Sequence, residues 1–177
     1  FKEDCDITIA SSQGMIKRTK LSDFKLLRYN KPVSCMKLKD DDMLVTAFKT
    51  CYNNIFVATN LGYGLWFDAK EIPIVGLKTS GVKSINLKDD KVVSVCNFKD
   101  TEYITIITNK GTGKRVKIGE FDISNRARRG LMLVREVKAN PYKVVKAFAC
   151  PKDSTIIIKT IELIHIKLTE LSIIDKY

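Results

Sequence analysis

Pairs of cationic side chains recur at matching positions along this chain. Lys17-Arg18 and Lys114-Arg115 each begin three residues after a glycine, and Leu65-Trp66 occupies the same place after a third glycine. A second set of cations lies further along the chain: Arg28, Lys31, Lys78, Lys83, Arg126, Arg128 and Arg129. Lys and Arg total 31 against 20 Asp and Glu, so the formal net charge is +11. This excess favours a polyanionic partner, because Lys and Arg displace the counterions that condense on phosphates.

The glycines and cations belong to a unit of about 49 residues that is repeated along the chain. A carboxylate followed by an apolar residue recurs at intervals of 48, 49 and 50 residues, at Asp23, Glu71, Glu120 and Glu170. Apolar segments that end in glycine keep nearly the same spacing, at 7–14, 55–62 and 104–111. Two independent series with one spacing indicate an array of similar structural units. The units are assigned to residues 7–54, 55–103, 104–154 and 155–177, the last of them incomplete.

Alternating apolar residues predict short β-strands in every unit. Pairs such as Ile7/Ile9 and Ile55/Val57 mark a first strand, and the Asn and Gly of 60–62 and 109–111 predict a hairpin into a second strand. Gly14 is the corresponding hairpin glycine of the first unit. Third strands are expected to begin at Val33, Val82 and Leu131, and fourth strands to cover 43–48, 92–98 and 144–148. Four short strands per unit are typical of a propeller blade. We therefore predict one all-β domain over residues 1–177, a propeller-like array of four-stranded blades with about 3.5 blades present.

Equivalent cations of neighbouring blades are expected to line up along one exterior arc that binds DNA, including those of the second strands, Lys17, Arg18, Lys114 and Arg115. The second set is expected to form a continuous basic stripe around the outside. Acidic residues gather partly in the turns at 40–42 and 89–90, which leaves the strands with the larger share of positive charge. Such a stripe can follow a curved duplex through sequence-independent phosphate contacts. The alternative is that these Lys and Arg are ordinary solvated residues inherited from an ancestral unit.

Composition also bears on the cellular compartment. The five cysteines are odd in number and never form a Cys-x-x-Cys pair, which favours a reducing environment: Cys5, Cys35, Cys51, Cys96 and Cys150. No apolar run approaches the ~20 residues of a membrane span, so we expect no membrane partner and a cytoplasmic location. Because the fourth unit stops half-way, we also expect this sequence to be part of a longer polypeptide.

Catalytic and metal-binding residues are not expected in this segment. His165 is the only histidine and alternates onto the polar face of its strand, so it is interpreted as solvated. The segment 111–114 lacks the first glycine and the final Ser or Thr of a Walker phosphate loop and is interpreted as a hairpin. Trp66 has two interpretations: it stacks on a sugar or base edge, or it packs against a neighbouring blade. Packing is favoured for a lone tryptophan.

Three groups of motifs carry a family resemblance. They are Ser12-Gln-Gly-Met-Ile-Lys-Arg-Thr19; Ala58-Thr-Asn-Leu-Gly62 with Glu71-Ile-Pro73; and Thr108-Asn-Lys-Gly111 with Arg126-Ala-Arg-Arg-Gly130. In this order and spacing the chain resembles the C-terminal β-pinwheel domain of the A subunits of bacterial type IIA topoisomerases, gyrase and topoisomerase IV. The resemblance implies strands partly exchanged between neighbouring blades and duplex DNA bent around a basic perimeter. The family's strand-cleaving tyrosine belongs to another domain.

The match departs from the gyrase pattern. Gyrase members carry a Gln-Arg-Arg-Gly-Gly-Lys-Gly box in the first blade, whereas this chain has Leu27-Arg-Tyr-Asn-Lys-Pro32, with only a partial echo at 128–130. The departure favours the topoisomerase IV type and argues against strong chiral wrapping of DNA. A gyrase-type wrapping domain and a protein-interaction propeller are the alternatives.

For the parent protein, the resemblance implies a second copy of the same polypeptide, the topoisomerase IV B subunit, magnesium and ATP. None of these cofactors is expected within this segment. Strand passage, with decatenation and relaxation of DNA in the bacterial nucleoid, would belong to the whole enzyme.

Overall fold

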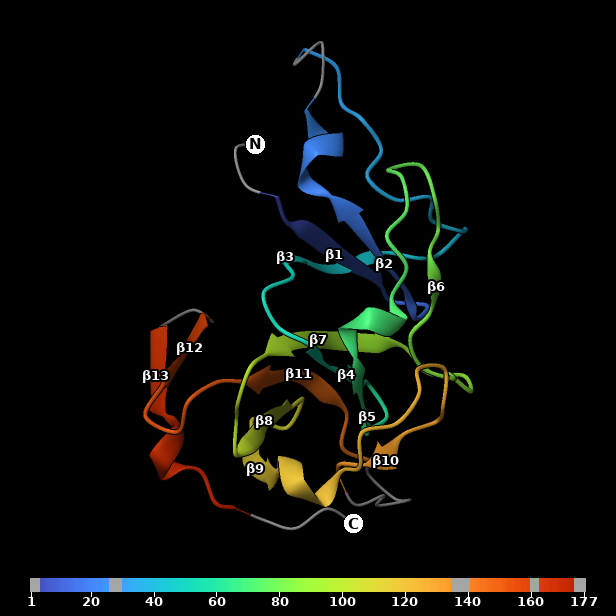
Figure 1. Cartoon of the computed structure of the whole chain (residues 1–177). Coiled ribbons are helices and arrows are strands. Elements are labelled where there is room, and N and C mark those ends of the chain that lie inside the picture. The colour runs from blue at the N-terminus through green and yellow to red at the C-terminus, as the bar shows by residue number, and fades with distance from the viewer. Residues whose placement is uncertain (1–3, 26–29, 135–140, 160–162, 174–177) are drawn as a thin grey trace.

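The computed structural model describes residues 4–25, 30–134, 141–159 and 163–173 (Figure 1). Within these ranges the chain forms short strands and four 3-10 helices: β1 Asp6–Ser11, β2 Met15–Lys20, η1 Leu21–Phe24, β3 Leu44–Lys49, β4 Asn54–Thr59, β5 Tyr63–Asp68, η2 Ala69–Glu71, β6 Val82–Lys83, β7 Val92–Phe98, β8 Tyr103–Thr108, β9 Gly113–Lys117, η3 Ile118–Glu120, β10 Leu131–Met132, β11 Val144–Ala149, β12 Thr155–Lys159, β13 Leu163–Lys167 and η4 Leu168–Glu170. The predicted all-β class is confirmed. No helix in these ranges has the length and apolarity to cross a membrane.

The strands form a series of small antiparallel sheets, one per blade. Their orders are β3-β1-β2-β6, β10-β5-β4-β7, β11-β8-β9 and β12-β13. In the first two blades the edge strands β6 and β10 come from the following repeat unit, where Ile16 pairs with Val82 and Gly64 pairs with Leu131. This confirms the exchange of strands that the family resemblance implied. Each of these two blades therefore depends on the next unit for its fourth strand.

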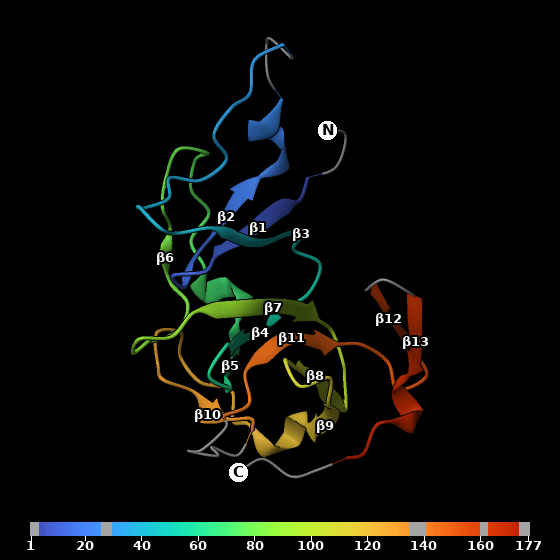
Figure 2. The same cartoon turned by 180° about the vertical axis from the view of Figure 1, so that it is seen from behind.

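The blades follow one another along an arc (Figure 1). Seen from both sides, β6 and β10 lie on its convex edge, while β3, β7 and β11 lie toward its inner side (Figure 2). The apolar core is divided between the blade junctions. One buried cluster joins Ile16 of the first blade to Val57 and Phe67 of the second, and another joins Phe56 to Ile106 of the third. Burial between blades stabilises the array, because a single thin sheet has no core of its own.

The predicted hairpins are confirmed at residues 11–15, 59–63 and 108–113, where β1 turns into β2, β4 into β5 and β8 into β9. Each second strand then runs into a 3-10 helix that contains the recurring carboxylate. The apolar residue after the carboxylate enters the core in the second and third units: Ile72 is 0% exposed and Phe121 is 4% exposed. The acidic series thus marks a structural turn in every unit.

One predicted strand is wrong. Residues 33–38, where the first unit's third strand was expected, form no strand. Their counterparts β6 and β10 are two-residue strands that exist only by pairing with the second strand of the preceding unit. The first unit has no such partner strand among the described residues, and Lys37 instead donates its backbone N–H to Thr79 O at 3.1 Å.

Candidate nucleic-acid interface

The cations carried by the second strands are largely buried. Lys17 is 0% exposed, Lys114 is 9% exposed and Arg115 is 8% exposed, so the prediction that these three side chains lie on the outer surface is wrong. Side chains alternate along β2, and Lys17 lies on the face that the following unit covers. The residue type alone does not reveal this burial. The desolvation that burial causes lowers the pKa of Lys17 and of Lys114 below that of an ordinary lysine.

Lys17 holds the backbone of the next unit. Its Nζ donates to Gly76 O at 2.8 Å and to Leu77 O at 2.7 Å, and lies 3.5 Å from Thr79 Oγ1. These acceptors belong to the loop that precedes β6. The ammonium group therefore organises the loop that delivers the exchanged strand.

The neighbouring arginines make an equivalent connection. Arg18 Nε donates to Ile72 O at 2.9 Å, and Arg115 Nε and Nη2 donate to Leu171 O at 3.0 and 2.8 Å. In both units the acceptor is the carbonyl of the residue that follows the recurring carboxylate. Arg18 is partly exposed and its Nη1 lies 3.6 Å from Asp6 Oδ2. Both arginines therefore join consecutive units.

Lys17→Met is expected to destabilise the chain by about 2–4 kcal/mol, because it removes the two charge-assisted hydrogen bonds that the buried ammonium group donates to Gly76 O and Leu77 O. Chemical denaturation measures this change. Lys20→Met, an exposed position on the same strand, is the control and should change stability by less than about 0.5 kcal/mol. Equal effects of the two substitutions would contradict the assigned role of Lys17.

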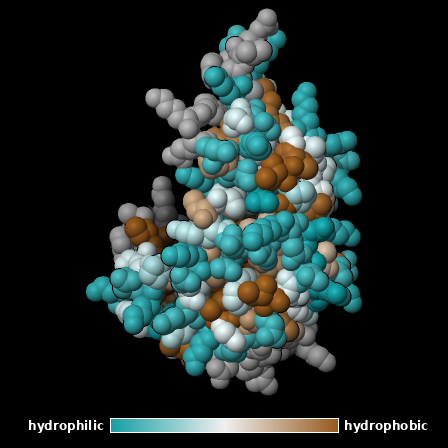
Figure 3. Space-filling model, in the orientation of Figure 1, coloured by the Kyte–Doolittle hydropathy of each residue, from teal (hydrophilic) through white to brown (hydrophobic). Residues whose placement is uncertain are grey.

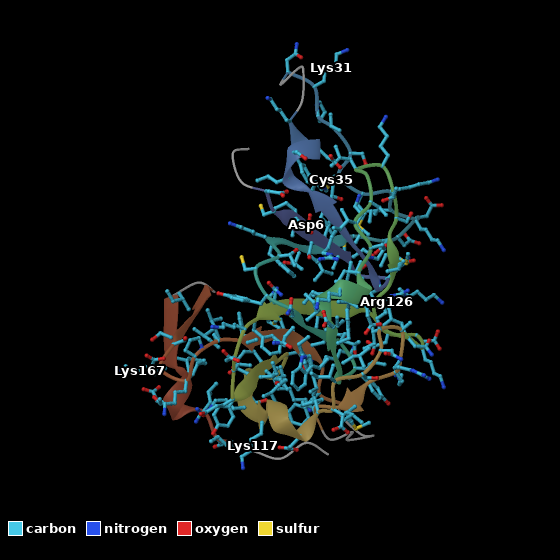
Figure 4. All side chains as sticks on the ribbon, in the orientation of Figure 1. Asp6, Lys31, Cys35, Lys117, Arg126 and Lys167 are labelled. Carbon is cyan, nitrogen blue, oxygen red and sulfur yellow. The ribbon has the colours of Figure 1, made fainter. Side chains whose placement is uncertain are left out.

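Four cations of the second set meet beside β6, and we call Lys83, Arg126, Arg128 and Arg129 the β6 cation cluster. Backbone hydrogen bonds bring the third unit against the second here: the residue after Arg126 donates its N–H to Ser84 O at 2.7 Å, and Asn86 N donates to Arg128 O at 2.9 Å. Residues 83–86 of the second unit and 126–129 of the third unit are thus adjacent on the convex edge, where Arg126 lies (Figure 4).

Two members of the cluster, Arg126 and Arg129, bond the surrounding backbone and so hold Lys83 and Arg128 in place. Arg126 Nε donates to Glu71 O and Nη1 to Lys83 O, both at 3.1 Å, and its backbone N–H donates to Glu71 Oε2 at 3.0 Å. The Arg129 guanidinium lies 3.7 Å from the centre of the Tyr63 ring and donates to Asn86 O at 3.2 Å.

Lys83 and Arg128 are exposed, and their side chains have no ion-pair or hydrogen-bond partner among the described residues. Between the arginines, Ala127 has a φ of 62°, a left-handed conformation that is uncommon for alanine. The backbone between Arg126 and Arg128 is therefore held in an uncommon conformation, and the Arg128 side chain that follows it is exposed.

The other members of the second set lie elsewhere. Lys78 is exposed in the loop before β6. Lys31 is exposed at the far tip of the first blade, well away from Arg126 (Figure 4). Arg28 lies outside the described residues. The second set therefore contains one compact cluster and separate single cations.

A further series of exposed cations was missed in the sequence. Lys20, Lys117 and Lys167 each end the second strand of their unit, and all three are exposed. Lys117 and Lys167 lie at the periphery of the third and fourth blades (Figure 4). Their regular spacing in the sequence could have revealed this series, because Lys20 and Lys117 stand two residues beyond Arg18 and Arg115 on the same strands.

The surface in this orientation is mainly hydrophilic, with separate apolar patches (Figure 3). Over the described ranges, no group of three or more His, Cys, Asp or Glu is placed to hold a metal ion. The side chain of His165 lies outside the part that is described. The five cysteines are free thiols, and burial raises the pKa of Cys96 to about 11.

Comparison with known proteins shows the family. The family model described as "DNA gyrase C-terminal domain, beta-propeller" matches residues 6–51, 53–95 and 102–151. The chain belongs to this family. It is similar to the A subunit of DNA topoisomerase 4 from Bacillus subtilis (strain 168), with 39% identity over 162 residues, which cover 90% of this chain and 20% of that protein. The same subunit of Staphylococcus epidermidis is 35% identical over 157 residues, covering 88% of this chain and 20% of that protein.

Solved structures of the family agree with the fold. A crystal structure of the C-terminal domain of DNA topoisomerase IV matches with a TM-score of 0.95 and 35% identity, covering 100% of this chain and 56% of that one. A DNA gyrase A C-terminal domain matches with a TM-score of 0.79 and 24% identity, over 88% of this chain and 52% of that one, and shows the fold alone. This propeller chain thus spans a fifth of the curated relatives and about half of the structural ones. The resemblance seen in the sequence is confirmed.

Proposed function

We propose that this chain is the DNA-binding part of a topoisomerase IV A subunit, which binds and bends duplex DNA on its convex edge. The observation that carries the proposal is the β6 cation cluster, where Lys83 and Arg128 are exposed while Arg126 and Arg129 hold the backbone that presents them. The net charge of +11 and the relatives that are A subunits of DNA topoisomerase 4 support it. Contacts of this kind read the phosphate backbone and not the base sequence.

Bending a duplex costs free energy, so the protein must make enough contacts with the DNA to offset that cost. Smooth bending of a 20–30 bp duplex by 40–90° costs on the order of 1–6 kcal/mol. A hydrogen bond to a charged group contributes about 1.5–3 kcal/mol, so two cations at one junction offset only a modest bend. Cations of adjacent units that reach solvent, Lys78 in the second, Lys117 in the third and Lys167 in the fourth, would extend the contact along the arc.

The parent enzyme would supply the chemistry. In this proposal the chain presents a DNA segment to the cleavage core of the longer polypeptide, which works as a pair of A subunits together with the B subunit. Magnesium and ATP would serve those other parts during strand passage, decatenation and relaxation. The residues described here bind and orient DNA.

The salt dependence of duplex binding tests the electrostatic mechanism. If about six phosphates are contacted, log affinity plotted against log salt concentration should fall with a slope near −5. Fluorescence anisotropy of a labelled linear duplex at several salt concentrations gives this slope. A slope near zero, or no binding at low salt, would contradict the proposal and favour a protein-interaction propeller.

A further inference from the structure

Trp66 occupies the position that arginine holds in the first and third units. At those positions Arg18 and Arg115 send their guanidinium groups to the carbonyl that follows the next unit's 3-10 helix. The backbone beside Trp66 keeps part of this arrangement, because Ser124 N donates to Trp66 O at 2.9 Å as Val75 N donates to Arg18 O at 2.8 Å. The bridges of Arg18 to Ile74 and of Arg115 to Ile173 have no counterpart at Trp66 among the described residues. The second junction therefore differs from the other two in this side chain and in the backbone pairing beside it.

Trp66 does not replace the arginine contact. Its one N–H donor, Nε1, is directed to Asn54 Oδ1 at 3.2 Å, and its ring packs against Phe98 with 6.1 Å between ring centroids. The contacts with Asn54 and Phe98 thus support the interpretation that the Trp66 side chain packs against other protein groups. A hollow of about 380 Å³ remains at the junction, lined in part by Trp66, Phe121, Arg128 and Leu131.

The lining of the hollow combines apolar and cationic side chains. Trp66 is partly buried, Phe121 is 4% exposed and Leu131 is 42% exposed, so part of the lining is carbon-rich. Arg128 and Arg129 also line it, against one carboxylate, that of Asp122. Two cations against one anion favour a negatively charged occupant over a cationic side chain of a protein partner. An apolar ring surface beside an exposed guanidinium fits a deoxyribose next to its phosphate.

We propose that this Trp66 hollow receives the sugar-phosphate backbone of bound duplex DNA, with the sugar against the indole ring and the adjacent phosphate on Arg128. The inference rests on the proposed DNA binding and adds to it a fixed contact point. At the other two junctions the arginine side chains occupy this place and bond protein carbonyls. The second junction would therefore set the register of the duplex on the array.

Intrinsic fluorescence tests this contact directly, because Trp66 is the only tryptophan in the chain. A linear duplex is titrated at low salt while tryptophan emission, acrylamide quenching and the anisotropy of labelled DNA are measured on the same samples. We expect the emission of Trp66 to change, and its quenching by acrylamide to fall, with the same midpoint as the anisotropy. Trp66→Leu should weaken duplex binding about 10-fold, an effect comparable to the loss of one aromatic stacking contact to a base.

Trp66→Arg is the matched variant, because it gives the second unit the side chain of the first and third. It is expected to fill the hollow by bonding Phe121 O and to weaken binding despite the added positive charge. If anisotropy shows binding while Trp66 emission and quenching stay unchanged, the inference is overturned and DNA binding stands. If anisotropy shows no binding, the proposed function itself fails.

Discussion

Reversing the charge of Lys83 and Arg128 together is expected to weaken duplex binding by at least about 100-fold, because in the proposed interface each would donate a charge-assisted hydrogen bond of about 1.5–3 kcal/mol to a phosphate. Both side chains are exposed at one junction and are held there by Arg126 and Arg129. The slope of log affinity against log salt should also become shallower by about 2, one unit for each phosphate that is no longer neutralised. Anisotropy of a labelled duplex measures both quantities.

The matched control is Lys99→Glu with Lys152→Glu, which changes the net charge by the same amount. These exposed lysines follow β7 and β11, strands at the opposite side of the blades from β6 and β10. We expect the control pair to weaken binding much less, through the general field alone. Equal effects of the two double variants would mean that overall charge, and not this face, binds DNA.

Gly130→Ala is expected to destabilise the chain by about 3 kcal/mol or more, which combines the strain of a left-handed alanine with a steric clash. Gly130 has a φ of +80°, and a Cβ there would lie 2.3 Å from Gly64 O. Gly81 repeats this arrangement against Ile16 O, also at 2.3 Å. For a chain of this size, the expected destabilisation lowers the melting temperature by roughly 6–12 °C, which calorimetry measures.

Gly119→Ala serves as the control, because a Cβ at Gly119 meets nothing within 4 Å and its φ is not positive. It should leave the melting temperature within about 2 °C of the original, since the added methyl group meets no neighbour. A small effect of Gly130→Ala would show that the exchanged strand does not approach its neighbour as closely as described. Gly81 and Gly130 thus allow the fourth strand of one blade to come from the next unit.

The repeat and most of its strands were predictable from the sequence because their signals are local. Side-chain alternation and turn residues act within a few positions, so the hairpins at residues 11–15 and 59–63 were predicted correctly. The strand that was expected at residues 33–38 is absent for a different reason. Strands such as β6 and β10 depend on pairing with a distant segment, and a local pattern does not show whether that partner is present.

The candidate interface likewise has features that the sequence predicted and features that only the structure showed. Sequence alone determined the net charge, the repeat and the recurrence of cations, and these suffice to indicate a polyanionic partner. Only the tertiary structure decided that Lys17, Lys114 and Arg115 are buried while Lys83 and Arg128 face solvent. The physical reason is that the exposure of a side chain depends on which backbone covers it, and here the covering backbone comes from a unit about fifty residues away.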